Sequence, residues 1–127
     1  MRRWPYLLIV DDDEDFRAGL RTALELKGYV VDEAPDGERA LEKLIEKPPL
    51  LMLLDLQMPR MNGRELLKKV RAAPGLREVP VVILSAFGFE WEAPLMGAEG
   101  YIAKPFEPET LYQTISSLLG PRSINVG

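Results

Sequence analysis

Residues 50–55 read LLMLLD, an unbroken apolar run that ends at the acidic residue Asp55. A strand with one face in water alternates apolar and polar side chains, whereas a strand covered on both faces is apolar throughout. The run therefore predicts a strand near the middle of a parallel sheet. Open parallel sheets bind ligands beyond the carboxyl ends of their strands, and Asp55 lies at such an end.

Apolar runs of strand length alternate with helical segments on both sides of this stretch. Strands are expected at residues 6–10, 29–33, 50–54, 79–84 and 101–103, with five helices between and after them. The fourth helix is expected to be short or distorted, because Gly88, Pro94 and Gly97 interrupt it. This order is typical of βαβ units, so the sequence predicts an α/β fold with a parallel sheet.

Particular residues mark the ends of the expected helices. Gly28 is placed to end the first, and Asp36 is placed to cap the second, which Pro48 and Pro49 should stop. Gly63 should open the third helix, and Pro108 fits the first turn of the last.

The composition limits the possible functions. With 127 residues the chain has the length of one domain. Its net charge of -4 is spread without long runs, which argues against direct binding to nucleic acid or a membrane. No apolar stretch reaches the length of a membrane span, so a cytoplasmic protein is expected. Because His and Cys are absent, any catalysis must use carboxylates, hydroxyls, lysine and metal.

Polar residues directly follow four of the expected strands: Asp11, Asp12 and Asp13, then Asp55, Ser85 and Lys104. Carboxylates that converge on one edge repel one another unless a cation lies among them, and oxygen ligands suit Mg2+. A carboxylate beside such an ion can attack phosphorus, while a lysine and a hydroxyl neutralise the transferred group.

Each of these residues also has an ordinary structural interpretation. Asp11 to Asp13 could be a helix-capping cluster, Asp55 a turn residue, and Ser85 a loop hydroxyl. In the same way Lys104 could be a surface charge and Tyr101 a half-buried strand residue. Their joint placement at successive strand ends favours a common site.

Four motifs occur in a fixed order along the chain: LIVDDD at 8–13, LDLQMP with MNG at 54–63, LSA at 84–86, and GYIAKPF at 100–106. With these motifs the sequence closely resembles the receiver domains of bacterial response regulators, from Tyr6 to about Leu119. The resemblance implies a flavodoxin-like (βα)5 three-layer sandwich with strand order 2-1-3-4-5. It also implies a receiver domain at residues 1–120 and a tail or linker at 121–127.

The resemblance assigns roles to the strand-end residues. Asp55 is implied as the phosphoacceptor, and Mg2+, for which Mn2+ could substitute, is implied at Asp11, Asp12, Asp55 and the Gln57 carbonyl. Ser85 and Lys104 are implied as the residues that contact the phosphoryl oxygens. The family also implies a cis peptide at Lys104-Pro105 and a switch that couples Ser85 to Tyr101.

A signalling switch of this kind is not an enzyme in the usual sense. The donor is implied to be a sensor histidine kinase or a phosphotransfer protein, since this chain has no histidine of its own. The receiver would pass the signal to a downstream protein or a fused output domain, as a monomer or weak dimer.

One segment departs from the family pattern. Between Ser85 and Tyr101 the chain is shorter than usual by about one helical turn, roughly 3.6 residues. It carries Phe87, Phe89 and Trp91 near Met96, which we expect to fold back over the sheet rather than form a partner patch. This shortening should weaken the dimer contact that the family usually makes through this face.

Two other functions stay open. The acidic cluster at residues 11–13 also resembles the nucleophile motif of haloacid-dehalogenase phosphohydrolases, which would make Asp11 the nucleophile. Alternatively, the chain is a degenerate receiver that acts only as an interaction module.

Four side chains should flank the phosphoryl group, namely Gln57, Met58, Ala86 and Phe87. A bulky ring at Phe87 should hinder the water that hydrolyses an acyl phosphate, so a long-lived phosphoryl group is expected. Phe87→Ala should accelerate dephosphorylation severalfold, as measured by loss of the phosphoryl group from purified phosphoprotein. An unchanged rate would rule out shielding by this ring.

Overall fold

Strand β3 (Pro49–Leu54) lies at the centre of a five-stranded sheet of order β2-β1-β3-β4-β5. The computed structural model describes residues 3–56, 62–86, 88 and 90–120. The other strands are β1 (Trp4–Val10), β2 (Val31–Ala34), β4 (Val81–Ala86) and β5 (Gly100–Lys104). Every neighbouring pair is parallel, which confirms the predicted sheet and its order.

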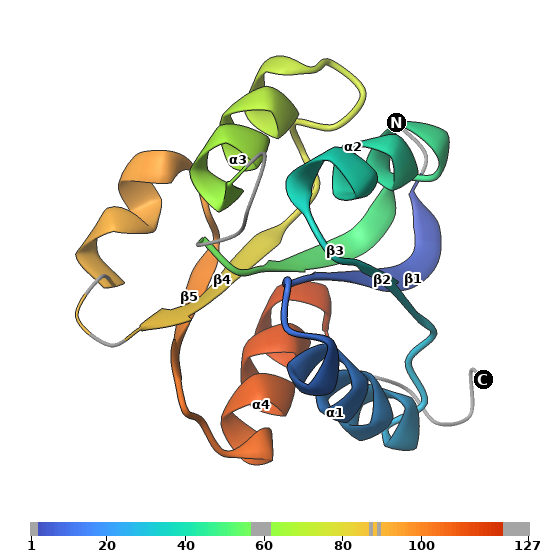
Figure 1. Cartoon of the computed structure of the whole chain (residues 1–127), viewed down its shortest axis with the longest axis vertical. Coiled ribbons are helices and arrows are strands. Elements are labelled where there is room, and N and C mark those ends of the chain that lie inside the picture. The colour runs from blue at the N-terminus through green and yellow to red at the C-terminus, as the bar shows by residue number, and fades with distance from the viewer. Residues whose placement is uncertain (1–2, 57–61, 87, 89, 121–127) are drawn as a thin grey trace.

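Helices cover both faces of the sheet (Figure 1). The four α-helices among the described residues are α1 (Glu14–Leu26), α2 (Gly37–Glu46), α3 (Gly63–Ala72) and α4 (Pro108–Leu119). In Figure 1, α1 and α4 lie on one face and α2 and α3 on the other. The three-layer α/β architecture predicted from the sequence is therefore confirmed.

The apolar run of β3 contributes to both cores. Leu51 and Leu53 belong to the cluster that includes residues of α1 and α4, whereas Met52 and Leu54 belong to the cluster beneath α2 and α3. All four side chains have no exposed surface, and each such burial stabilises a fold by about 1.5–3 kcal/mol. This two-sided burial explains why the strand shows no polar alternation.

Side-chain caps fix where the helices begin. Asp36 accepts a hydrogen bond from Arg39 N at 2.8 Å, as predicted. Asp13 caps α1 in the same way through Phe16 N, at 3.1 Å. The capping interpretation of the acidic cluster therefore applies to Asp13. As predicted, α2 ends before the two prolines: its last residue is Glu46, and Pro49 begins β3.

The segment between β4 and β5 contains no α-helix among its described residues, at the place where the sequence predicted a short or distorted fourth helix. It forms two single-turn 3-10 helices, η1 (Glu90–Glu92) and η2 (Pro94–Met96). Gly97 ends η2 with φ 85°, a backbone conformation that favours glycine. The predicted shortening and irregularity are confirmed.

The shortened segment covers the sheet with small and flexible side chains. Ala93 is buried and Met96 packs against the core cluster of α2 and α3. Trp91 is 67% exposed and Leu95 is 77% exposed, so the expectation that the aromatics fold back was wrong for Trp91. Phe87 and Phe89 lie outside the described residues.

Gly63 lies where α3 crosses the end of β3. Its N–H donates to Leu56 O at 2.9 Å, and a Cβ at this position would lie 2.4 Å from Asp55 O. The close atom belongs to the backbone and cannot rotate away. Only glycine therefore allows α3 to start this close to Asp55.

Gly63→Ala should lower the free energy of unfolding by about 1–3 kcal/mol, because the added methyl group overpacks the turn. Gly19→Ala is a matched control, since Gly19 lies in α1 with nothing within 4 Å of the added Cβ. The control should gain about 0.5–1 kcal/mol from helix propensity. Urea unfolding of the unsubstituted chain and of the two variants measures both changes in the free energy of unfolding. Equal changes for the two substitutions would contradict the steric argument.

Candidate functional site

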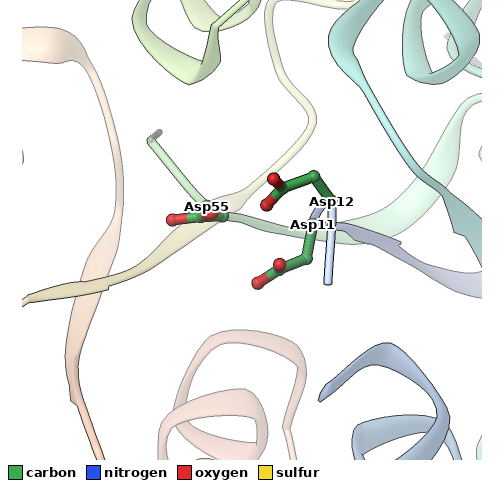
Figure 2. A group of neighbouring side chains, drawn as sticks. All are labelled: Asp11, Asp12 and Asp55. Atoms are coloured by element: carbon green, nitrogen blue, oxygen red, sulfur yellow. The ribbon is translucent and has the colours of Figure 1, made fainter. Parts of the chain in front are cut away.

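Three aspartates meet at the carboxyl ends of two neighbouring strands, β1 and β3. Asp11 and Asp12 follow β1, and Asp55 follows β3. The parallel register pairs Val10 with Leu54, and Asp55 N donates to Val10 O at 2.9 Å. The next residues along both strands are thereby brought together, as Figure 2 shows.

The three carboxylates form a set of oxygen ligands. One oxygen from each of Asp11, Asp12 and Asp55 lies within 4.8 Å of the others. Asp11 and Asp55 are buried, while Asp12 is exposed, so the cluster opens to water on one side. Oxygen ligands with room for water suit Mg2+, which keeps several waters and takes one or two carboxylates. The residues present fit this ion.

Lys104 brings a positive charge to the same place. Its Nζ lies 2.8 Å from Asp11 Oδ2 and 3.9 Å from Asp55 Oδ1. The residue ends β5, which is separated from β3 by β4 in the sheet. The peptide bond Lys104-Pro105 is cis, as the family resemblance implied. An ammonium so placed can neutralise charge that develops at Asp55.

The end of β4 supplies the predicted hydroxyl. Ser85 is buried, and it pairs in register with Ala103 next to Lys104. The hydroxyl of Tyr101 donates to the main-chain oxygen of Ala86. The two predicted switch residues are therefore connected through a single intervening residue. Gln57, Met58 and Phe87 lie outside the described residues.

Asp11 is fixed through every oxygen that it carries. Its Oδ1 accepts from Asp13 N at 2.9 Å, and its Oδ2 accepts from Lys104 Nζ. Its main-chain oxygen accepts from Arg17 Nη1 at 2.7 Å. The turn that carries the acidic cluster is therefore held by contacts to α1 as well as by the sheet.

A short ionic network supports Arg17. Arg17 Nε lies 3.0 Å from Glu33 Oε1, and Arg21 Nη1 lies 2.8 Å from Glu33 Oε2. The hydrogen bond from Arg21 lowers the pKa of the Glu33 carboxyl below its ordinary value of 4.5, and the bond from Arg17 acts in the same direction. The sequence interpretation missed this network, although arginines four residues apart lie on one face of a helix.

Phe16 is a second residue that the sequence interpretation missed. Lys104 Nζ lies 4.1 Å from the centre of the Phe16 ring, which meets the Phe106 ring edge-on at 6.2 Å. No sequence motif marked Phe16, because its apolar side chain fits the helix pattern equally well as a core residue.

The family assignment follows from this geometry together with the sequence. The profile described as "Response regulator receiver domain" matches residues 7–116. The chain belongs to this family. Among the described residues, no helix has the length and apolar character required to cross a bilayer.

Individual relatives agree with the family. The chain is 39% identical over 116 residues to the transcriptional regulatory protein CpxR of Escherichia coli, and this match covers 89% of the chain and 48% of CpxR. It is 37% identical to response regulator RR06 of Streptococcus pneumoniae, over 89% of the chain and 52% of that protein. The chain thus spans about half the length of the curated relatives that it matches.

Two solved structures have the same fold over nearly the whole length of their own chains. The chemotaxis protein CheY4 of Vibrio cholerae matches with a TM-score of 0.83 and 33% identity, covering 90% of this chain and 98% of that one. A putative response regulator of Chloroflexus aurantiacus matches with a TM-score of 0.85 and 32% identity, covering 93% and 100%. The flavodoxin-like fold is confirmed.

The lowered pKa of Glu33 makes a pH-dependent contribution to stability. The contribution is fully present above pH 4.5 and is lost as the pH falls toward the lower pKa of the folded state. Glu33→Gln should cost on the order of 1 kcal/mol above pH 5, and the difference from the unsubstituted protein should shrink below pH 4.5.

Urea unfolding at a series of pH values measures this difference. Glu25→Gln is the matched control, because Glu25 also pairs with Arg21 but its side chain is half exposed. The control should change stability little. A Glu33→Gln difference that stays constant from pH 7 down to pH 3 would contradict the assignment.

Proposed function

We propose that this chain is a phosphoacceptor that takes a phosphoryl group onto Asp55 in a Mg2+-dependent reaction and so switches a protein-interaction surface. The observation that carries the proposal is the cluster of Asp11, Asp12 and Asp55 with the ammonium of Lys104 beside it. The donor would be a phosphohistidine on a sensor histidine kinase or a phosphotransfer protein. A cytoplasmic location remains a prediction.

Each residue has a chemical task in this proposal. A carboxylate oxygen of Asp55 attacks phosphorus, and the bond from phosphorus to the donor's imidazole nitrogen breaks. Asp11, Asp12, Asp55 and the Gln57 carbonyl would hold the Mg2+ ion, which neutralises charge on the transferred group. Lys104 pairs with a phosphoryl oxygen, and the Ser85 hydroxyl donates to another.

The hydrogen bonds at Asp11 argue against the phosphohydrolase alternative. Both carboxylate oxygens of Asp11 accept hydrogen bonds, from Asp13 N and from Lys104 Nζ. Hydrogen bonds to both oxygens lower the nucleophilicity of the Asp11 carboxylate. Membership of the receiver family favours Asp55 as well.

The switch would act through the end of β4. Contact between Ser85 and a phosphoryl oxygen would shift the strand end, and Ala86 lies next along it with its main-chain oxygen bonded to Tyr101. A displaced Ala86 would change the position of the Tyr101 hydroxyl. The surface near Tyr101 includes η1 and η2, where Trp91 and Leu95 are exposed. The surface would exist in two conformations, and phosphorylation would shift the equilibrium toward one of them.

The output would go to a downstream protein or a fused domain. The curated relatives are about twice as long as the matched region, and CpxR is named a transcriptional regulatory protein. Residues 1–120 would form the receiver domain and residues 121–127 a tail or linker. We propose no direct contact of these residues with nucleic acid or a membrane, and we expect a monomer or weak dimer.

Intact-mass spectrometry after incubation with acetyl phosphate and Mg2+ tests the proposal. The unsubstituted chain should gain one phosphoryl group, and Asp55→Asn should gain none because its amide is not a nucleophile. Asp11→Asn should be phosphorylated much more slowly. Steady phosphate-ester hydrolysis lost in Asp11→Asn and kept in Asp55→Asn would instead support the phosphohydrolase, and no mass gain would support the interaction module.

Metal binding can be followed without phosphorylation. Mg2+ at 100 times its dissociation constant should stabilise the fold by about 2.7 kcal/mol, and Asp12→Asn should reduce this gain. Asp13→Asn is the matched control, because it removes a neighbouring charge while asparagine still caps α1.

A further inference from the structure

The position of the Lys104 ammonium depends on what surrounds it. A lysine side chain is a flexible four-carbon stem with a point charge at its tip, so it does not fix its own geometry. The Lys104 side chain is 29% exposed, which leaves it room to swing toward water. Some feature of the site must therefore hold the charge over Asp55.

Three groups from the described part of the chain lie around this ammonium. Two are carboxylates, with Asp11 Oδ2 at 2.8 Å and Asp55 Oδ1 at 3.9 Å. The third is the Phe16 ring, whose centre lies 4.1 Å from Lys104 Nζ. This distance is well inside the reach of a cation–π interaction. The edge-on contact with Phe106 holds the ring in turn.

The three groups respond differently to the chemistry of the site. When the Asp11 carboxylate is shared with a divalent cation, its attraction for Lys104 falls, and the charge of Asp55 changes when it becomes an acyl phosphate. The face of Phe16 carries no ionisable group and binds no metal. Its attraction for the ammonium therefore persists through every step.

We propose that Phe16 is a positioning residue that holds the Lys104 ammonium over Asp55 when its carboxylate partners are engaged elsewhere. The proposal rests on the proposed function of Asp55. Phe16 lies on α1 and is only half buried, whereas Leu20 and Leu24 of the same helix are buried in the core. The ring thus sits at the rim of the core, where it meets Lys104.

Phosphorylation rates with acetyl phosphate and Mg2+ test this role. Phe16→Leu keeps an apolar side chain and removes the ring, and it should slow phosphorylation by about twofold to tenfold. Phe16→Tyr keeps the ring and should restore the rate to near that of the unsubstituted chain. A rate for Phe16→Leu equal to the unsubstituted rate would overturn the proposal, as would equal slowing by Phe16→Tyr.

Tyr112→Leu is the matched control. Tyr112 lies on α4, and its ring is the cation–π partner of Lys27 at 4.8 Å. The substitution removes an aromatic ring and a cation–π contact on the same face of the sheet, but it does so away from the acidic cluster. Its phosphorylation rate should be unchanged, and slowing equal to that of Phe16→Leu would show that general loosening of this face is the cause.

A double-mutant cycle shows whether Phe16 acts through Lys104. In the Lys104→Met background, Phe16→Leu should no longer slow phosphorylation. In the metal-free protein, Phe16→Leu should lower the urea midpoint more when Lys104 is present than in the Lys104→Met background. Full additivity in either measurement would overturn the proposal.

The double-mutant cycle measured by urea unfolding distinguishes failure of the proposed phosphorylation of Asp55 from failure of the proposed role of Phe16. If the unsubstituted chain gains no phosphoryl group, the proposed function fails, and the urea cycle still reports whether the ring and the ammonium interact. If the chain is phosphorylated and the substitutions at Phe16 leave its rate unchanged, the positioning role alone fails.

Discussion

The structure of the site depends on the repulsion among three carboxylates that the parallel register of β1 and β3 forces together. Asp11, Asp12 and Asp55 each place an oxygen within 4.8 Å of the others. Lys104 contributes one positive charge, so the four ionised groups keep two negative charges. A divalent cation carries two positive charges, which balance the two net negative charges of the cluster. This balance is the physical reason for the proposed Mg2+ at this edge.

Contacts outside the cluster hold the charges in place. Burial of β3 on both faces fixes the strand that presents Asp55, and the lack of a side chain at Gly63 lets α3 begin against its carbonyl. The Arg17 guanidinium binds the main-chain oxygen of Asp11 while Glu33 offsets its charge. Because Glu33 neutralises Arg17, this pair can support the turn at Asp11 without adding a net positive charge that would repel a metal ion.

The sequence allowed the strand ends to be predicted, because apolar runs mark where strands stop and parallel strands stop at one edge. Asp11, Asp12, Asp55 and Lys104 were found in this way. Contacts between elements distant in sequence leave no periodic signal, so Phe16 could not be distinguished from a core residue. The sequence pattern also showed where a helix is interrupted, but it could not show which structure replaces the helix or that Trp91 stays exposed.

Two α3 side chains bind the segment that replaces the fourth helix: Arg64, whose Nη2 lies 3.0 Å from Glu92 Oε1, and Arg71. Arg71 donates to the main-chain oxygens of Gly97, Arg77 and Val79, and its Nη2 lies 2.8 Å from Glu99 Oε1. The bond to Gly97 satisfies a carbonyl at the end of η2, and the bonds to Arg77 and Val79 satisfy carbonyls of the loop between α3 and β4. Glu99 Oε1 also accepts from the main-chain N–H of Val81, the first residue of β4. The start of β4 is thus anchored, through Glu99, to the same arginine that binds Gly97 at the end of η2. This contact would couple the proposed shift of β4 to the surface formed by η1 and η2.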